Sequence, residues 1–215
     1  MAETHFNKGL EKLLNEDYEG ALADFNKAIE LNPTDSDFYY NRGDAKLALE
    51  DYNGAIEDYN KTIELDPANE YAYSNRGAAK FELQDFSAAI ADYSKAIELY
   101  PEFEDAFYNR GSANREIGEL EKAISDFTMA IEIDPEFIDA YNDRGVVKFE
   151  LGKINEAIDD FSKAIEIYPE FGAAYCNRGE AKISLDDKEG ALEDWKKAQK
   201  LGDEDADELI NKYFK

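Results

Sequence analysis

The sequence predicts an all-α fold of stacked helical hairpins, because a single 34-residue pattern runs along most of the 215-residue chain. Every proline follows this period, at Pro33, Pro67, Pro101, Pro135 and Pro169. The tripeptide Asn-Arg-Gly follows the same spacing, and it begins at Asn41, Asn75, Asn109 and Asn177. A fixed period of this length is typical of repeat arrays, in which each unit buries its apolar face against its neighbours.

Six repeats and one further helix account for residues 2–215 when position 1 of the period is placed at Ala2. The predicted repeats are 2–35, 36–69, 70–103, 104–137, 138–171 and 172–205. Residues 206–215 restart the register, but Tyr213 takes the place of the glycine found at position 8. We therefore expect a C-terminal capping helix, with no partner helix packed after it.

Each repeat is predicted to contain a first helix near positions 2–14 and a second helix near positions 17–30. Position 16 carries an aspartate that can cap the second helix in four repeats, at Asp17, Asp51, Asp85 and Asp187. The proline at position 32 ends the second helix, because proline lacks a backbone N–H group. Helices this short are marginal in isolation, so we expect neighbouring helices to stabilise them.

Small and aromatic residues recur at positions that predict where the two helices meet. Position 8 is glycine and position 20 is alanine in all six repeats, so we expect the two backbones to approach closely there, as at Gly111 and Ala123. Aromatic residues dominate positions 4 and 24. We interpret both aromatic rows, with His5 at position 4 of the first repeat, as core rather than as a cofactor site.

The composition excludes several classes of function. The chain carries 50 acidic and 24 basic residues, and its formal net charge of −26 argues against nucleic acid as a partner. A single cysteine, Cys176, cannot form an internal disulfide, and the N-terminus lacks a basic start followed by an apolar signal core. No apolar run reaches the roughly 18 residues that a membrane span requires. We therefore expect no membrane association and a reducing, cytoplasmic environment.

Position 7 is arginine in the second to sixth repeats, and position 23 is aspartate in all six. Because arginine occurs only in repeats that follow another repeat, we predict salt bridges between successive repeats, such as Asp92 with Arg110. Pairing within one repeat is the structural alternative. The functional alternative is an arginine row that binds ligand carboxylates, which requires these side chains to face a binding groove.

These residues resemble the tetratricopeptide repeat pattern, which has an aromatic residue at position 4, glycine at 8, alanine at 20, an aromatic residue at 24 and proline at 32. The resemblance covers essentially the whole chain, although arginine and lysine mostly replace the family's usual leucine and tyrosine at positions 7 and 11. It implies a right-handed superhelical solenoid of six helix-turn-helix repeats with a C-terminal capping helix. It also implies a concave groove, lined by the first helices, that holds a peptide and performs no chemistry.

The resemblance places positions 2, 5, 6, 9, 12 and 13 in the groove, where acidic and aromatic side chains predominate. Asparagine at position 6 offers one acceptor and two donors, so it can pair with the backbone of an extended ligand. Hydrogen bonding of these amides to a neighbouring helix is an equally weighted alternative. The predicted peptide-binding residues are Asn41, Asn75, Asn109, Asn177, Tyr40, Tyr71, Tyr108, Asp37, Asp105 and Asp139.

We interpret the chain as a non-enzymatic scaffold that binds an extended, basic or amphipathic segment of a partner protein. His5 and Cys176 have no catalytic partners in the pattern, so no catalytic residue, cofactor or metal site is predicted. Basic residues are absent from positions 2, 5 and 6, which argues against acidic C-terminal tails as ligands of the groove. Two alternatives stay open: an array that self-assembles through its ends or convex face, in place of the expected monomer, and an adaptor subunit of a larger catalytic complex.

Overall fold

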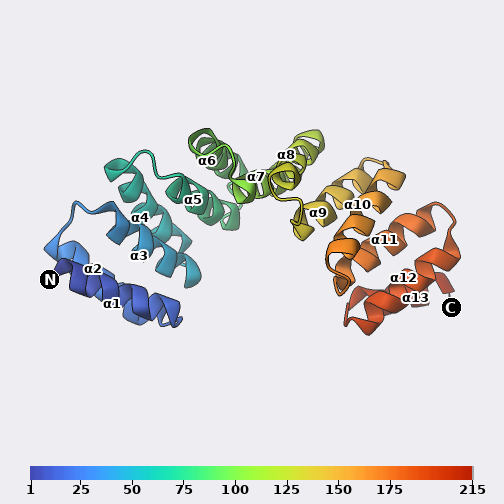
Figure 1. Ribbon diagram of the computed structural model, residues 1–215, viewed down its shortest axis with the longest axis horizontal. Coiled ribbons are helices and arrows are strands. Elements are labelled where there is room, and N and C mark those ends of the chain that lie inside the picture. Colours follow the sequence, from blue (N-terminus) through green and yellow to red (C-terminus); the bar gives the residue numbers. More distant parts are fainter. Residues whose placement is uncertain (215) are drawn as a thin grey trace. The chain divides into compact units, whose positions relative to one another are not determined.

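The computed structural model describes residues 1–214, which form thirteen α-helices and, within that range, no β-strand (Figure 1). The all-α class predicted from the sequence is confirmed. The helices cluster in two compact units, Met1–Ala113 and a second unit that begins at Asn114, and the division falls inside α7. Each unit is a series of helix pairs, in which consecutive helices pack against each other.

Helices α1 to α12 are 13 or 14 residues long and are joined by short turns. The first unit contains α1 (Ala2–Leu14), α2 (Tyr18–Leu31), α3 (Ser36–Ala48), α4 (Tyr52–Leu65), α5 (Glu70–Glu82), α6 (Phe86–Leu99) and most of α7 (Glu104–Glu116). The second contains α8 (Leu120–Ile133), α9 (Ile138–Glu150), α10 (Ile154–Ile167), α11 (Gly172–Ser184), α12 (Lys188–Lys200) and α13 (Asp205–Phe214). Second helices span positions 17–30 or nearly so, as predicted, whereas first helices begin one position earlier than predicted. Lys215, the last residue of the predicted capping helix, lies outside the described residues.

Aspartate at position 16 caps the second helix where the sequence predicts a cap. The carboxylate of Asp51 accepts a hydrogen bond from the backbone N–H of Gly54 at 3.1 Å. Equivalent bonds of 2.9–3.2 Å are formed by Asp17, Asp85 and Asp187. Each cap satisfies one of the backbone N–H groups that have no partner inside the helix, so the start of the second helix is fixed locally.

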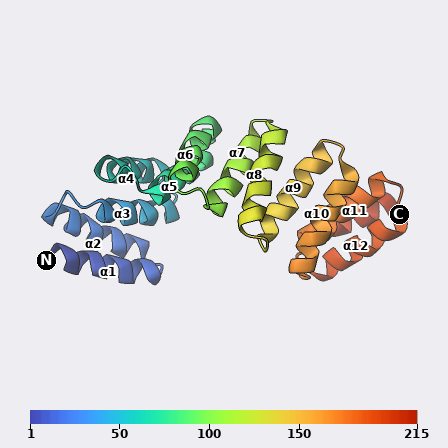
Figure 2. The same ribbon diagram turned by 45° about the horizontal axis from the view of Figure 1, so that its top comes forward.

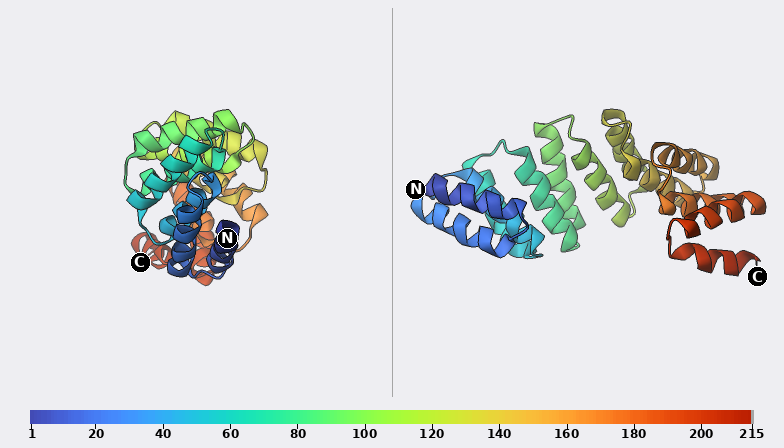
Figure 3. Two further views of the ribbon diagram at one scale, coloured as in Figure 1. Left: turned by 90° about the vertical axis from the view of Figure 1, so that its left-hand side faces the viewer. Right: turned by 60° about the horizontal axis from the view of Figure 1, so that its bottom comes forward.

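The first helices form a continuous row within each unit. In the first unit α1 contacts α3, and α3 contacts α5; in the second unit α9 contacts α11. The views in Figures 2 and 3 show α1 beside α2 and α3 beside α4, as successive hairpins of the first unit. We call the side chains at positions 2, 5, 6, 9, 12 and 13 of the first helices the first-helix face. It carries most of the predicted binding residues.

The core is built on the aromatic row at position 24, whose side chains are at most 2% exposed. Glycine at position 8 makes room for this ring: a Cβ added to Gly43 would lie 2.7 Å from the Tyr59 ring. The predicted close approach of Gly111 to Ala123 stays a prediction. Alanine at position 20 also joins the buried alanine at position 10 of the next repeat, as Ala21 does with Ala45.

The aromatic row at position 4 differs in part from the prediction, because most of these rings lie at the edge of the core rather than inside it. Tyr39, Tyr73, Tyr141 and Tyr175 are only half-buried, and in this row only Phe107 is buried. Each tyrosine ring lies under the arginine at position 7 of its own repeat, with the guanidinium carbon 5.3–5.6 Å from the ring centre. A ring in this place supports the arginine through a cation–π contact as well as packing at the edge of the core.

Candidate functional site

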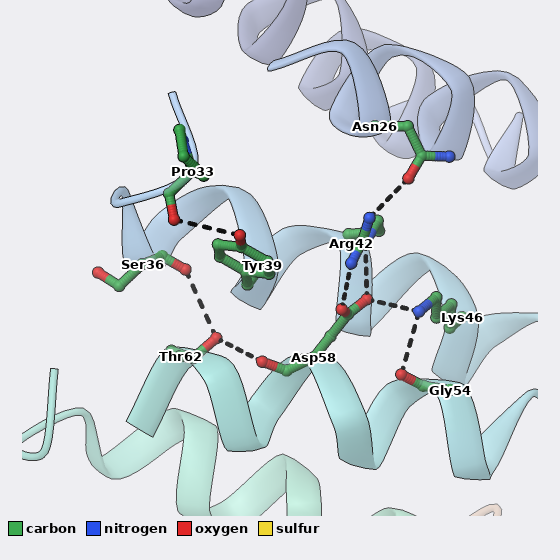
Figure 4. Close-up of polar contacts among 9 residues, drawn as sticks. All are labelled: Asn26, Pro33, Ser36, Tyr39, Arg42, Lys46, Gly54, Asp58 and Thr62. Carbon is green, nitrogen blue, oxygen red and sulfur yellow. Dashed lines mark hydrogen bonds and ion pairs between the residues drawn. The ribbon is translucent and has the colours of Figure 1, made fainter. Parts of the chain in front are cut away.

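The arginine at position 7 pairs with the aspartate at position 23 of its own repeat. In the second repeat, Arg42 donates from Nε and Nη2 to the two carboxylate oxygens of Asp58, and the Nε bond is 2.8 Å long (Figure 4). Lys46 at position 11 lies 2.8 Å from the same carboxylate. The same bidentate arrangement recurs for Arg76 with Asp92, Arg144 with Asp160 and Arg178 with Asp194.

The predicted salt bridge from Asp92 to Arg110 in the next repeat is therefore wrong. Asp92 is 5% exposed and accepts hydrogen bonds from Arg76 and Lys80, which both belong to its own repeat. The link to the preceding repeat runs through the third guanidinium nitrogen instead, because Arg110 Nη1 donates to Ser94 at 3.0 Å. The other acceptors in this row, also at position 25, are Asn26, Asn60, Thr128 and Ser162.

This pairing also argues against the functional alternative, in which the arginine row binds ligand carboxylates. Three nitrogens of Arg42 are engaged within the hairpin stack, and its flat face lies over the Tyr39 ring. An α-helix turns by about 100° per residue, so positions 7 and 11 lie on the side opposite to positions 2, 5, 6 and 9. The arginines thus hold the stack together and are directed away from the first-helix face.

The first repeat has no arginine, and His5 takes part in its ion pair. Asp24 accepts hydrogen bonds from Lys12 at 2.6 Å and from His5 Nδ1 at 3.0 Å. These bonds, that from Lys12 first, lower the pKa of the Asp24 carboxyl group. The packing role predicted for His5 is therefore incomplete, because its ring is also a hydrogen-bonding partner.

The asparagine row at position 6 is not uniform. Asn75 donates to the Tyr40 hydroxyl at 3.0 Å and to Asp44 at 2.9 Å, and Asn177 donates to Asn142 at 2.9 Å; all three bonds reach the preceding first helix. Asn41 donates to the backbone oxygen of Asp37 in its own helix. Asn109 instead lines a pocket. The donor groups of Asn75 and Asn177 are thus engaged between helices, whereas their side-chain oxygens accept no hydrogen bond among the described residues.

A half-buried carboxylate organises the first-helix face in the second repeat. Asp44 at position 9 accepts a hydrogen bond from the Tyr59 hydroxyl at 2.8 Å as well as the Asn75 bond. Burial raises the pKa of Asp44, and these two hydrogen bonds act in the opposite direction. Burial also raises the pKa of Tyr40, one of the predicted binding residues. Tyr40 therefore contributes to a fixed polar network as well as to the surface.

A pocket of about 320 Å³ opens on the first-helix face of the first unit, between α5, α6 and α7. We call it the Tyr93 pocket; it is lined by Ala78, Phe81, Glu82, Tyr93, Tyr108, Asn109 and Ser112. The pocket is open because Ala78 stands at position 9 of the third repeat. At the same position of the second repeat, the longer side chain of Asp44 covers the hydroxyl of Tyr59. Tyr93 is 2% exposed and lies at the base, while the exposed Glu82 lies at the rim.

Two predicted binding residues, Tyr108 and Asn109, meet in the Tyr93 pocket. Tyr93 itself, at the base, was not predicted from the sequence as a binding residue. The repeat pattern assigns position 24 to the core in every repeat, and Tyr93 is indeed buried. The signal that could have revealed the pocket is the pairing of a tyrosine at position 24 with a small residue at position 9. Burial, with the nearby Glu82 carboxylate, raises the pKa of Tyr93, so its hydroxyl stays protonated near neutral pH.

The remaining predicted residues lie at first-helix-face positions of their own units, outside this pocket. Asp37, Asp105 and Asp139 at position 2 are exposed. Tyr71 is 50% exposed and packs edge-on against Phe103, with ring centres 5.3 Å apart. These side chains make the face acidic and partly aromatic beyond the pocket itself.

In the second unit, a pocket of about 250 Å³ lies on the first-helix face between α11 and α13. Its lining includes Cys176, Asn177 and Glu180 of α11 and Asp205 and Glu208 of α13. Burial raises the pKa of the Cys176 thiol and of Glu180. Because the thiol stays protonated, Cys176 is not an activated nucleophile. With Glu180, Asp205 and Glu208 in its lining, this second pocket is also acidic.

The side chains of residues 1–214 include no group of three or more histidine, cysteine, aspartate or glutamate residues placed to hold a metal ion. Over the same range, no helix is long and apolar enough to cross a membrane.

Matching family models cover most of the chain. The model described as TPR repeat matches residues 9–50 and 43–84, and the model described as Tetratricopeptide repeat matches residues 70–103, 104–137 and 138–171. Among curated proteins, no significant match is found.

Solved structures give the same picture. The crystal structure of MamA is 31% identical, with a TM-score of 0.71, over 77% of this chain and 96% of MamA. YrrB, described as a TPR protein with an unusual peptide-binding site, is 25% identical, with a TM-score of 0.72, over 87% of this chain and 97% of YrrB. Pseudomonas aeruginosa PilF has a TM-score of 0.84 over 98% of this chain and 97% of its own, but at 17% identity it shows the fold alone.

We predict that Arg42 and Asp58 are strongly coupled in stability, whereas Arg76 and Asp58 are not. In a double-mutant cycle of Arg42→Met and Asp58→Leu, we expect a coupling energy of about 1–3 kcal/mol from denaturant unfolding. The reason is that removing one partner leaves a buried charge uncompensated. The matched cycle of Arg76→Met with Asp58→Leu is the control, and equal coupling in both cycles would overturn the within-repeat assignment.

Proposed function

The chain belongs to the tetratricopeptide repeat family, and on that premise we propose that its first-helix face binds an extended segment of a partner protein that carries basic side chains. Members of this family are generally interaction scaffolds without catalytic activity. YrrB, a related chain, is described as having a peptide-binding site. The observation that carries the proposal is the Tyr93 pocket, with its aromatic walls and acidic rim.

The Tyr93 pocket fits a lysine or arginine side chain of the ligand. The aliphatic part of such a side chain would pack between the rings of Phe81 and Tyr108, and the cationic end would meet the Glu82 carboxylate. Cation–π contact with either ring adds to this attraction. A pocket of about 320 Å³ is large enough for one side chain rather than for a folded domain.

The charge of the rest of the face supports a basic ligand. Arginine and lysine at positions 7 and 11 pair with aspartate on the opposite side of each first helix, as Arg76 and Lys80 do with Asp92. Exposed carboxylates such as Asp37, Asp105 and Asp139 remain on the first-helix face. This separation would draw a basic segment to the face and repel an acidic one.

Backbone recognition would depend on the asparagine row, with different roles along the face. Asn109 lines the Tyr93 pocket, where its amide can pair with both groups of a ligand peptide unit. Asn75 and Asn177 bond the preceding first helix through their amide nitrogens, so in this proposal they offer only a side-chain oxygen to a ligand N–H group. Asn41 contacts its own helix and contributes least.

The six-repeat division, the monomeric state and the cytoplasmic compartment stay predictions. Self-assembly through the ends or convex face, and a role as adaptor subunit of a larger catalytic complex, stay alternatives.

We predict that Glu82→Gln weakens binding of a lysine-containing peptide selected from an extended-peptide library. Because the Glu82 side chain is exposed, the loss should be about two- to fivefold, and it should shrink as ionic strength rises. Isothermal titration calorimetry is the measurement. The control is Glu98→Gln, which removes an exposed carboxylate from the second helix of the same repeat. Equal losses in the two variants would count against the pocket.

We predict that Asn109→Ala weakens the same peptide more than Asn41→Ala does. Loss of one or two hydrogen bonds to the ligand backbone should cost about 0.5–1.5 kcal/mol each. Asn41→Ala is the matched control, because this amide occupies the same position of the repeat but bonds its own helix. Scrambling the peptide between its basic residues should change affinity little, and parental binding by Asn109→Ala would show that this asparagine has no role in ligand recognition.

A further inference from the structure

The last repeat breaks a charge pattern that the five preceding repeats keep. Position 29 is glutamate in those five, and in four of them the lysine at position 26 pairs with it at 2.6–2.9 Å, as Lys163 does with Glu166. In the last repeat, position 29 is Lys200 and position 26 is Lys197. Position 25, which is asparagine, serine or threonine in the first five repeats, is Lys196. Three positions that carry no unpaired lysine in the first five repeats are therefore all lysine here.

These lysines gather around a shallow pocket of about 540 Å³ on α11 and α12. We call it the lysine pocket; it is lined by Tyr175, Arg178, Lys182, Glu193, Asp194, Lys196, Lys197 and Lys200. Arg178 and Lys182 are neutralised by Asp194, at 2.7 Å each. Lys197 lies over the Tyr175 ring, 5.9 Å from its centre. In the described part of the chain, Lys196, Lys197 and Lys200 form no ion pair.

Helix-end electrostatics does not explain the cluster. Lys197 and Lys200 lie in the last turn of α12, where a cation interacts favourably with the helix dipole. The same advantage exists at the ends of the other second helices, yet α2, α4, α6, α8 and α10 carry no basic residue in the last turn. Lys196 lies one turn from the end and is not accounted for by the dipole at all.

We propose that the lysine pocket is a second binding site, which takes an acidic segment of a partner protein. The ammonium groups of Lys196, Lys197 and Lys200 would each donate to a ligand carboxylate, and the Tyr175 ring would contact the segment between its charges. The chemistry is opposite to that of the Tyr93 pocket. The two proposed ligands therefore differ in charge: a basic segment for the Tyr93 pocket and an acidic segment for the lysine pocket.

The surroundings of the lysine pocket favour a narrow peptide over an extended polyanion. Glu193 and Asp194 line the pocket itself, and the whole chain has a formal net charge of −26. A membrane surface or a nucleic acid would bring its charge close to those carboxylates as well as to the lysines, and repulsion would oppose it. A short acidic segment can contact the lysines without lying against the Glu193 and Asp194 carboxylates.

The lysine pocket lies apart from the first-helix face. Its residues from α11 stand at positions 4, 7 and 11, on the side of the helix opposite to positions 2, 5, 6 and 9. The proposal therefore does not depend on the function proposed for the first-helix face, and the two segments need not compete.

The test is titration of the full chain with a fluorescent hexaglutamate peptide, followed by fluorescence anisotropy at low ionic strength. We expect saturable binding that Lys196→Gln/Lys200→Gln weakens about fivefold or more, because two cationic contacts are removed. The matched control is Lys27→Gln/Lys163→Gln, which removes two position-26 lysines that already pair with glutamate. This control should bind as the parent does, and circular dichroism should show that both variants keep the parental thermal midpoint.

Three results would overturn the proposal. One is the absence of saturable hexaglutamate binding to the parent chain. Another is equal binding by the parent and the Lys196→Gln/Lys200→Gln variant. The third is tighter binding of the parent to phosphatidylserine vesicles than to hexaglutamate, lost in the same variant, which would assign the pocket to an anionic membrane surface instead.

Discussion

The bidentate pairing of the position-7 arginine with the position-23 aspartate is the interaction on which the rest of the structure depends. The aspartate is nearly fully buried, as Asp58 is at 3% exposure, so its charge requires compensation from both Arg42 and Lys46. The remaining nitrogen of the arginine reaches position 25 of the preceding repeat. One side chain thus closes its own hairpin and joins it to its neighbour, which is the local coupling expected of a repeat array.

This pairing also determines the charge of the surfaces. In the repeats that have it, the pairing places arginine, and in most of them lysine, on the side of the first helix that meets aspartate. Carboxylates and tyrosines predominate on the other side, where the one arginine of the row, Arg115, pairs with Glu150. The first-helix face is therefore acidic because the cations are used inside the stack, not merely because the chain is rich in acid. In the sixth repeat, lysines take the place of the usual asparagine, serine or threonine at position 25 and of the glutamate at position 29, so the cationic surface that we infer lies on α12.

Much of the fold could be predicted because the information is local and periodic. The 34-residue period, the aspartate caps and the proline stops define helices whose ends the structure confirms to within one residue at most positions. The salt-bridge partner of each aspartate was harder to predict, because position 23 lies 16 residues after the arginine of its own repeat and 18 residues before the arginine of the next. Distance along the chain therefore does not distinguish pairing within a repeat from pairing between repeats. Arginine at position 7 occurs only in repeats that follow another repeat, and the bond that reaches the preceding repeat runs from its Nη1 to position 25 rather than to the aspartate.

The candidate site was less predictable, because it depends on departures from the repeat. Asn75 and Asn177 occupy the same position as Asn109, yet their amides meet Tyr40, Asp44 and Asn142, which differ from repeat to repeat. The Tyr93 pocket exists where alanine replaces the larger side chains found at this position in the other repeats. A periodic pattern predicts what all repeats share, whereas binding depends on how one of them differs.

The central claim is that the partner segment lies on the first-helix face, and site-specific photo-crosslinking tests it most directly. A benzophenone side chain placed at Ser112 lies in the lining of the Tyr93 pocket, whereas the same group at Lys95 lies on the second helix of the preceding repeat. Irradiation with a library-selected lysine-containing peptide should give a crosslinked product from the Ser112 variant and none from the Lys95 variant. Crosslinking at Lys95, or its absence at Ser112 while the peptide still binds, would contradict the account.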